Sequence, residues 1–450
     1  MAGFGVGLLR RALAHYRGFE PDARRFLLVT LVGGAAMSLW WIDFNLYLRA
    51  LGYESSGIGV IATAASVAAA LAAFPASALS DRVGRRAVMI GGTLLSLAAV
   101  AGLVATGDPA WVLVLAALYS VGNQAIGVVG VPYMSEHSRP EHRSELFALQ
   151  FAIGSATNVI AAALGGVVAG AIASSMGLPE GSPDTYRIIL VFMVVLLVAA
   201  LALMLRLRDD RPSLTRPAAL HAAGEPAAFP QRPTRQRFAR IGLGLTIRDR
   251  RAFVRLLFPS FLIATGAGQV IPFLNLFIQG KFGLDLAALN GVFAVTSVGT
   301  MVAVLYQPTL ARRFGRIRSV IIVQGASIPF LLVLGFSPLI WTVILAMAVR
   351  NSLMNAGNPI FNAFAMDRVS AAERATLAAS MSLTWSVGWV VAGAYYSTVQ
   401  KLFGFDVGYT IDFVTIIVLY SVATTLYWHW FRDAEPAPPG VTVATLGATD

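Results

Sequence analysis

Asp43 is the acidic residue whose position could do chemistry, because it interrupts a long apolar segment near the start of the chain. It is the only acidic residue that we place well inside such a segment. Taking a carboxylate out of water disfavours its charged form, so the group can bind or release a proton as its access to water changes. Arg350 interrupts another apolar segment. Two hypotheses follow: Asp43 and Arg350 serve proton coupling, or they form a permanent ion pair.

A stripe of carboxamides follows Arg350 along the chain. Its members are spaced 4-3-4, which places them on one face of a helix: Asn351, Asn355, Asn358 and Asn362. Carboxamides offer paired donors and acceptors to a solute, although Asn also links helices inside membranes. We predict substrate contact for this stripe, and we expect Gly357 and Pro359 to break its helix.

Other polar residues in apolar segments extend the predicted binding site. Polar groups inside a bilayer are costly unless they face protein or water, so they mark helices that enclose an aqueous path. The predicted substrate-binding residues are Asn45, Asn123, Gln124, Gln269, Asn275, Asn351, Asn355, Asn358 and Trp385. Aromatic residues such as Trp40, Trp41 and Trp389 belong to the same segments. A cavity with aromatic walls and carboxamides suits an amphipathic organic solute.

The elements that position these residues must be membrane-spanning helices. Hydrophobic residues make up 57% of the 450 positions and charged residues only 13%, whereas a soluble domain carries about 25% charge. Apolar runs of about 20 residues, enough to span a bilayer as helices, recur throughout. We predict an all-α integral membrane protein with twelve transmembrane helices, at 26–48, 57–80, 86–106, 110–134, 145–174, 187–206, 253–280, 287–311, 318–336, 339–365, 374–400 and 408–431.

The basic residues orient these helices. With both termini in the cytoplasm, the outward loops hold only Arg49, Arg187, Lys281 and Lys401 out of 34 basic residues. This is the positive-inside bias, so the net charge of +11 reflects contact with membrane lipids and gives no reason to expect a nucleic-acid partner. We expect a multi-pass protein of the cell inner membrane. The absence of cysteine excludes disulfides and thiolate metal sites.

The chain is organised as two related halves. Leu79 to Arg85 corresponds to Leu310 to Arg316 at an offset of 231, and Asn45 corresponds to Asn275 at an offset of 230. Two parallel six-helix repeats with a binding site between them are a known transporter plan. The predicted parts are a cytoplasmic segment at 1–25, six-helix bundles at 26–206 and 251–432, a cytoplasmic linker at 207–250 and a disordered tail at 433–450.

The connection between the second and third predicted helices reads Ser77-x-Leu79-Ser80-Asp81-Arg82-x-Gly84-Arg85-Arg86. It resembles the hallmark motif of the major facilitator superfamily, G-x-L-x-D-R-x-G-R-[RK], with Ser77 in place of the first glycine. The resemblance implies that helices 1, 4, 7 and 10 line the cavity. It also implies a cytoplasmic gate, for which the predicted residues are Asp81, Arg82, Gly84, Arg85, Arg86, Arg143 and Arg374.

The sequence contains none of the catalytic motifs HExxH, G-x-S-x-G or the P-loop. We therefore expect a carrier and no enzyme, with no cofactor or metal, acting as a monomer on a small-molecule substrate and a proton. Proton-coupled export of an amphipathic solute is the first hypothesis. Uncoupled or proton-symporting uptake of a polar metabolite such as a sugar is the alternative. The antiporter motif of drug exporters has a Gly-Pro pair where this chain reads Ala161 to Gly166, which weakens drug–proton antiport.

Overall fold

The structure is a computed structural model that describes residues 19–136, 143–179, 181–208, 249–369 and 374–432. Within these ranges the chain is helical and has no strand, and nine of its helices are long and apolar enough to cross a membrane. The predicted fold class, an all-α integral membrane protein, is confirmed. The count of twelve spans and the bounds of the parts stay predictions. Most of the predicted linker and tail, and most of the segment at 1–25, lie outside the described residues.

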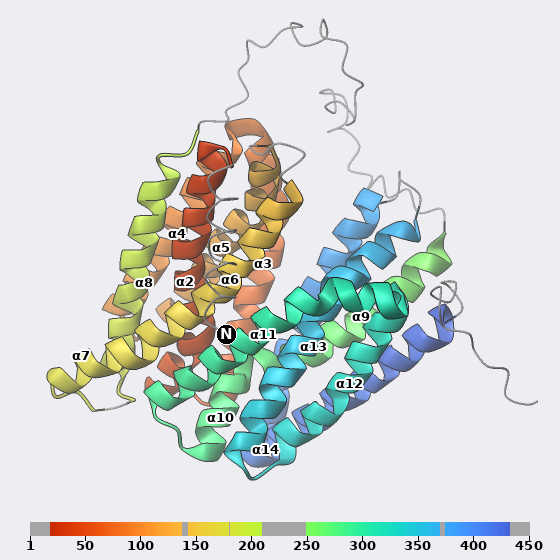
Figure 1. Cartoon of the computed structure of the whole chain (residues 1–450). Coiled ribbons are helices and arrows are strands. Elements are labelled where there is room, and N and C mark those ends of the chain that lie inside the picture. The colour runs from red at the N-terminus through yellow and green to blue at the C-terminus, as the bar shows by residue number, and fades with distance from the viewer. Residues whose placement is uncertain (1–18, 137–142, 180, 209–248, 370–373, 433–450) are drawn as a thin grey trace, which may run out of the picture.

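The N-terminal half forms one group of helices (Figure 1). Its elements are α2 (Pro21–Ala50), α3 (Ser55–Val83), α4 (Arg85–Ala105), α5 (Pro109–Glu136), α6 (Arg143–Ala162), the π-helical turn η2 (Ala163–Val168), α7 (Ala169–Ser175) and α8 (Pro183–Met204). The sequence predicts one helix over 145–174, whereas the structure inserts η2 between α6 and α7.

The C-terminal half forms the second group (Figure 1). Its elements are α9 (Arg250–Val270), the 3-10 turn η4 (Ile271–Phe273), α10 (Leu274–Phe282), α11 (Leu286–Phe314), α12 (Arg316–Phe336), α13 (Ile340–Asp367) and α14 (Arg374–Phe431). Two helices meet inside α14 at Gly404, whose backbone is not helical (φ 70°). The expected break at Gly357 and Pro359 is wrong, because α13 runs through both residues.

The two repeats of the basic hinge adopt the same backbone conformation. Gly84 joins α3 to α4 with φ 94° and ψ 151°, and Gly315 joins α11 to α12 with φ 84° and ψ 167°. Residues with a Cβ rarely adopt a φ in this range, so glycine is favoured at both corners. The repeat predicted from the sequence is therefore a repeat of local structure.

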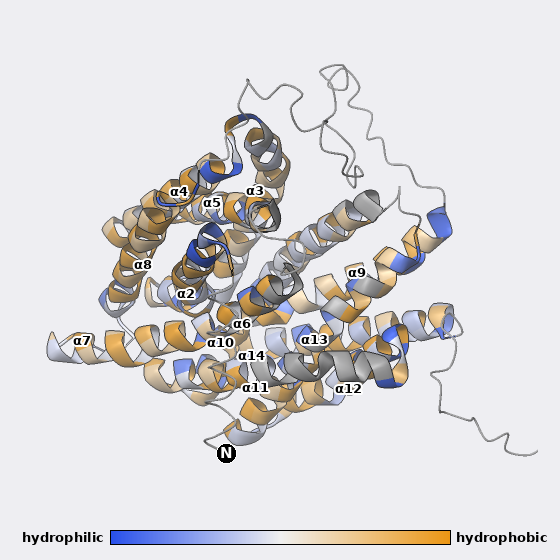
Figure 2. Ribbon diagram, turned by 45° about the horizontal axis from the view of Figure 1, so that its top comes forward, coloured by the Kyte–Doolittle hydropathy of each residue, from blue (hydrophilic) through white to orange (hydrophobic). Residues whose placement is uncertain are grey.

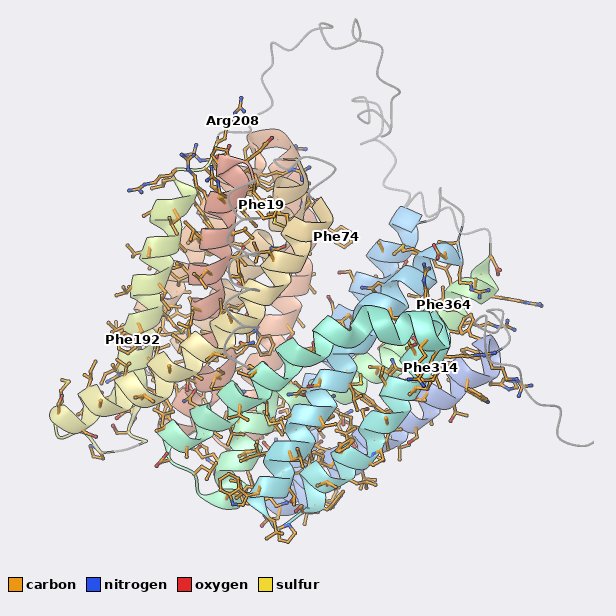
Figure 3. The ribbon with its side chains drawn as sticks, in the orientation of Figure 1. Phe19, Phe74, Phe192, Arg208, Phe314 and Phe364 are labelled. Atoms are coloured by element: carbon orange, nitrogen blue, oxygen red, sulfur yellow. The ribbon has the colours of Figure 1, made fainter. Side chains whose placement is uncertain are left out.

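The two ends of the molecule differ. We name the end with the hinges at Gly84 and Gly315 the basic end; Arg208, labelled in Figure 3, lies there. We name the opposite end, where α2 ends at Ala50 and α10 ends at Phe282, the closed end. The ribbons of the two halves lie together at the closed end and diverge towards the basic end (Figure 1).

The outer surface is apolar. Leu71 is 71% exposed, Phe74 67% and Trp341 78%, and Figure 2 shows hydrophobic residues along much of each helix. Exposed apolar area of this extent is unfavourable in water but matches the hydrocarbon interior of a bilayer. The protein is a multi-pass membrane protein.

Candidate functional site

A cavity of about 330 Å³ lies between the two halves. Its walls come from α2, α3 and α5 in the N-terminal half and from α9, η4 and α14 in the C-terminal half. Four of the predicted substrate-binding residues line it together: Asn45, Asn123, Gln124 and Trp385. Because both halves contribute to its walls, any movement of one half against the other changes its shape.

Aromatic rings form two walls of the cavity. On the N-terminal side, Trp40 stacks on Phe44 and Tyr119 with ring centroids 3.7 Å and 3.9 Å apart. Across the cavity, Trp389 packs edge-on against Trp41 with centroids 5.5 Å apart. Flat rings on both sides favour a flat or ring-containing solute.

The polar groups of the cavity are neutral. The side chains of Asn45, Asn123 and Gln124 contribute carboxamides, and the other polar residues lining it are Ser66, Ser120 and Ser386. Among the described lining residues there is no Asp, Glu, Lys, Arg or His. The indole Nε1 of Trp389 is buried and has no hydrogen-bond partner in this conformation.

Asp43 lies outside this cavity, buried at the contact between the halves. It is 3% exposed, and its Oδ1 accepts a hydrogen bond of 3.2 Å from Nδ2 of Asn290 on α11. Its Oδ2 has no partner. The oxygen Oδ1 of Asn290 is also buried without a partner. A charged carboxylate with one neutral donor and no cation is poorly compensated, whereas a neutral carboxyl could donate to the unpartnered carboxamide oxygen after a small rotation.

The π-helical turn η2 packs directly against this pair. A Cβ added to Gly165 would lie 2.7 Å from Oδ2 of Asp43, and one added to Gly166 would lie 2.8 Å from Cβ of Asn290. No side chain other than hydrogen fits either position without displacement. The segment from Ala161 to Gly166, which lacks the proline of the antiporter motif, thus covers Asp43. π-helical turns of this kind are frequent at functional sites.

Arg350 is not the partner of Asp43. Its Nη2 donates to the hydroxyl of Tyr420 at 2.9 Å, and its Nη1 donates to Oδ1 of Asn351 at 3.1 Å. Both partners belong to the C-terminal half, and Arg350 does not line the cavity. The structural ion pair between Asp43 and Arg350 is therefore not formed, and nothing in this geometry gives Arg350 a part in proton coupling.

The remaining predicted binding residues lie away from the cavity lining. In the asparagine stripe, the side chain of Asn355 donates to the carbonyl of Asn351 within α13, while Asn358 is exposed. Gln269 and Asn275 are 1% and 2% exposed. Substrate contact by these five residues stays a prediction that the cavity geometry does not support.

Of the predicted gate residues, Arg86 has hydrogen bonds recorded within the N-terminal half. Arg86 donates to the carbonyls of Met204 and Leu205, at 3.3 Å and 2.7 Å, where the end of α8 leaves carbonyl groups without helical partners. Arg82 is exposed and Arg85 is half-buried. The side chains of Asp81, Arg143 and Arg374 lie outside the described residues. The gating role stays a prediction.

Sequence reasoning missed two residues of interest. Asn290 is absent from the predicted site, although a lone carboxamide in an apolar helix is the signal that identifies the other polar positions. The statement that Asp43 is the only acidic residue well inside a span is wrong, because Asp412 is 0% exposed within α14. Asp412 Oδ2 accepts from Nε2 of Gln400 at 3.0 Å.

A family model described as Major Facilitator Superfamily matches residues 26–393, which is most of the chain. The chain belongs to the major facilitator superfamily. The resemblance of the hinge motif is thereby confirmed, and this superfamily member is a transporter. No curated protein matches the chain in sequence.

Solved structures of this superfamily share the fold. A bacterial homologue of the human lysosomal transporter Spinster, described as inward-facing and unoccupied, has a TM-score of 0.70 at 14% identity, covering 93% of this chain and 97% of its own. A D-xylose–proton symporter has a TM-score of 0.70 at 13% identity, covering 94% and 100%. The nucleoside transporter NupG has a TM-score of 0.68 at 13% identity, covering 91% and 99%. At this identity the likeness establishes the fold alone.

Proposed function

We propose that this protein is a proton-coupled carrier that moves an uncharged, ring-containing, amphipathic solute across the cytoplasmic membrane by alternating access. The single observation that carries the proposal is the position of Asp43. Its carboxyl group is buried without a cation, against the half of the molecule that must move away when the closed end opens.

Proton coupling follows from this position. In the conformation described, Asp43 is shut off from water, so its neutral form is favoured and it holds a proton. Separation of α2 from α11 would remove Asn290 and admit water, so the proton would leave on that side. The positive-inside rule assigns the basic end to the cytoplasm, so the closed end faces the outside. When the closed end opens, the proton on Asp43 would therefore be released to the outside.

The chemistry of the cavity supports the choice of solute. Bringing an ion into a cavity without an opposite charge is unfavourable, and the described lining residues carry no charge. The aromatic walls favour a planar ring, and the carboxamides favour hydrogen-bonding groups on that ring. Export remains our proposal for the direction. Uptake of a polar metabolite is the second candidate, favoured by the carboxamides and by the D-xylose and nucleoside substrates named for two structural neighbours.

A ligand screen and a coupling assay test the proposal. Thermal unfolding of the purified protein is measured with a nucleoside, D-xylose, an aromatic lipophilic cation and a neutral aromatic amide, because a ligand that binds only the folded state raises the melting temperature. We expect the neutral ring-containing compounds to stabilise the protein most. Transport of the best ligand into proteoliposomes should then respond to an imposed pH gradient. Stabilisation by the cation alone, or transport insensitive to the gradient, would refute the proposal.

A further inference from the structure

Two asparagines bond reciprocally across the contact between the halves. Nδ2 of Asn45 donates to the carbonyl of Pro272 at 2.6 Å, and Nδ2 of Asn275 donates to the carbonyl of Ile42 at 2.6 Å. Asn45 therefore bonds the turn η4 directly before the helix of Asn275, and Asn275 bonds the helix that carries Asn45. The two bonds close a ring between α2 and the segment formed by η4 and α10.

The pair follows the internal repeat of the chain. Asn45 and Asn275 are equivalent at an offset of 230, and each accepting carbonyl lies three residues before the partner asparagine. The same contact is thus made twice, once from each half. Because the two bonds are related by the pseudo-symmetry of the halves, separation of the halves would break both bonds together.

The two asparagines differ in their surroundings. Asn275 is 2% exposed, and its Oδ1 accepts from the backbone nitrogen of Leu276 at 2.9 Å, which holds the carboxamide in place. Asn45 is half-buried and lines the cavity, as does Pro272, which carries the accepting carbonyl. The bond made by Asn45 therefore lies at the boundary between cavity and closed end, while the bond made by Asn275 is buried away from the cavity.

Other contacts between the halves surround this pair. Nη1 of Arg49 lies 3.4 Å from the carbonyl of Leu276, and Oγ of Ser397 donates to the carbonyl of Ser56 at 2.8 Å. These two bonds are made once, without a counterpart at the equivalent position. Among the hydrogen bonds recorded between the described residues at the closed end, the asparagine pair is the one that both halves make in equivalent form.

We propose that Asn45 and Asn275 form a latch that keeps the closed end shut, with Asn45 as the member that a solute in the cavity can reach. This inference rests on the proposed carrier function, since only a carrier must open this end. A hydrogen bond contributes about 0.5–1.5 kcal/mol net, so loss of one should favour the open state about two- to tenfold.

The distance between the halves at the closed end tests the latch. The chain has no cysteine, so spin labels can be attached at Glu54→Cys and Lys401→Cys, both exposed positions, and their distance distribution measured by pulsed electron resonance. We expect a short distance to dominate in the parent. Asn275→Ala should raise the longer-distance population about two- to tenfold, and Asn45→Ala should do the same. Asn123→Ala, which removes a cavity carboxamide with no recorded bond across the halves, should leave the distribution unchanged.

The choice of variants and of measurement separates an effect on the latch from an effect on folding or on transport. Asn275→Ser keeps an acceptor near the Leu276 nitrogen while losing the bond to Ile42, so it should shift the distances as Asn275→Ala does, with a smaller loss of melting temperature than Asn275→Ala. The measurement needs neither substrate nor proton gradient, so it succeeds or fails apart from the coupling assay. An unchanged distribution in both Asn275 variants, or an equal shift in Asn123→Ala, would overturn the latch.

Discussion

Among the described residues, Asp43 and Asp412 are buried carboxyl groups with similar immediate partners and different places in the fold. Asp43 is 3% exposed and Asp412 is 0% exposed. Each accepts one hydrogen bond from a carboxamide nitrogen, from Asn290 and Gln400 respectively, and each has one oxygen without a partner. Asn290 belongs to the half opposite Asp43, whereas Gln400 and Asp412 both belong to α14.

The comparison shows that burial alone does not identify a coupling group. Separation of the halves would break the pair of Asp43 and Asn290 and expose the carboxyl to water. The same movement would leave Asp412 and Gln400 together inside the C-terminal half. A carboxyl group can exchange a proton in step with the conformational change only if its own environment changes. This favours Asp43 over Asp412 as the coupling group.

The strongest test replaces each carboxyl by its neutral isostere. Asp43→Asn should abolish the response of transport to an imposed pH gradient, because position 43 can no longer bind and release a proton. Asp412→Asn should keep the response, since that position holds no exchangeable proton in the cycle. Gradient-driven flux into proteoliposomes measures both, and an Asp412→Asn protein that loses its gradient response would remove the distinction.

A smaller effect is expected from filling the space beside each pair. Gly165→Ala would place a Cβ 2.7 Å from Asp43 Oδ2, and Gly408→Ala would place one 2.8 Å from Gln400 Nε2. Overpacking of this kind costs about 1–3 kcal/mol, so both should lower the melting temperature. Only Gly165→Ala should also impair gradient-driven flux.

Gly170→Ala provides the matched control, because it lies in α7 shortly after Gly165 and a Cβ there meets nothing within 4 Å. It should not lower the melting temperature, since alanine is favoured over glycine in a helix, and it should leave flux unchanged. Equal stability losses for Gly165→Ala and Gly170→Ala would mean that the close packing of η2 on Asp43 has no consequence.

The smallest effect is expected from removing the carboxamide partners. Asn290→Ala deletes the hydrogen bonds to Asp43 and to the Leu286 carbonyl, and Gln400→Ala deletes the one to Asp412. Each bond is worth about 0.5–1.5 kcal/mol, so calorimetric melting should detect a modest loss in both variants. Asn290→Ala should in addition shift the pH at which gradient-driven flux is half-maximal, because it changes the surroundings of the coupling group. A shift of the same size in Gln400→Ala would contradict the assignment.

Much of the architecture could be read from local features of the chain. The apolar segments predict membrane-spanning helices because the bilayer allows few other structures. The repeat of the hinge predicted two related halves, and Gly84 and Gly315 indeed share one backbone conformation. Asn45, Asn123, Gln124 and Trp385 were selected as polar or aromatic residues of apolar segments, and the structure brings them to one cavity.

The asparagine stripe shows where such reasoning stops. Periodicity places Asn351, Asn355 and Asn358 on one face of α13, but it does not say what that face meets, and in the structure they do not line the cavity. Arg350 was considered with Asp43 because both are charged residues in apolar segments. Its actual partner, Tyr420, lies far along the chain and has no distinguishing local pattern.

The sequence by itself determined the class of the protein and its two-fold repeat, and it predicts the orientation in the membrane, because these depend on hydrophobicity and charge summed over whole segments. Only the tertiary structure decided which groups meet: Asp43 with Asn290 and the π-helical turn, and Asn45 with Asn275 in reciprocal bonds. Such contacts join residues more than 100 positions apart, and their formation depends on how two halves pack, a property that no local pattern encodes.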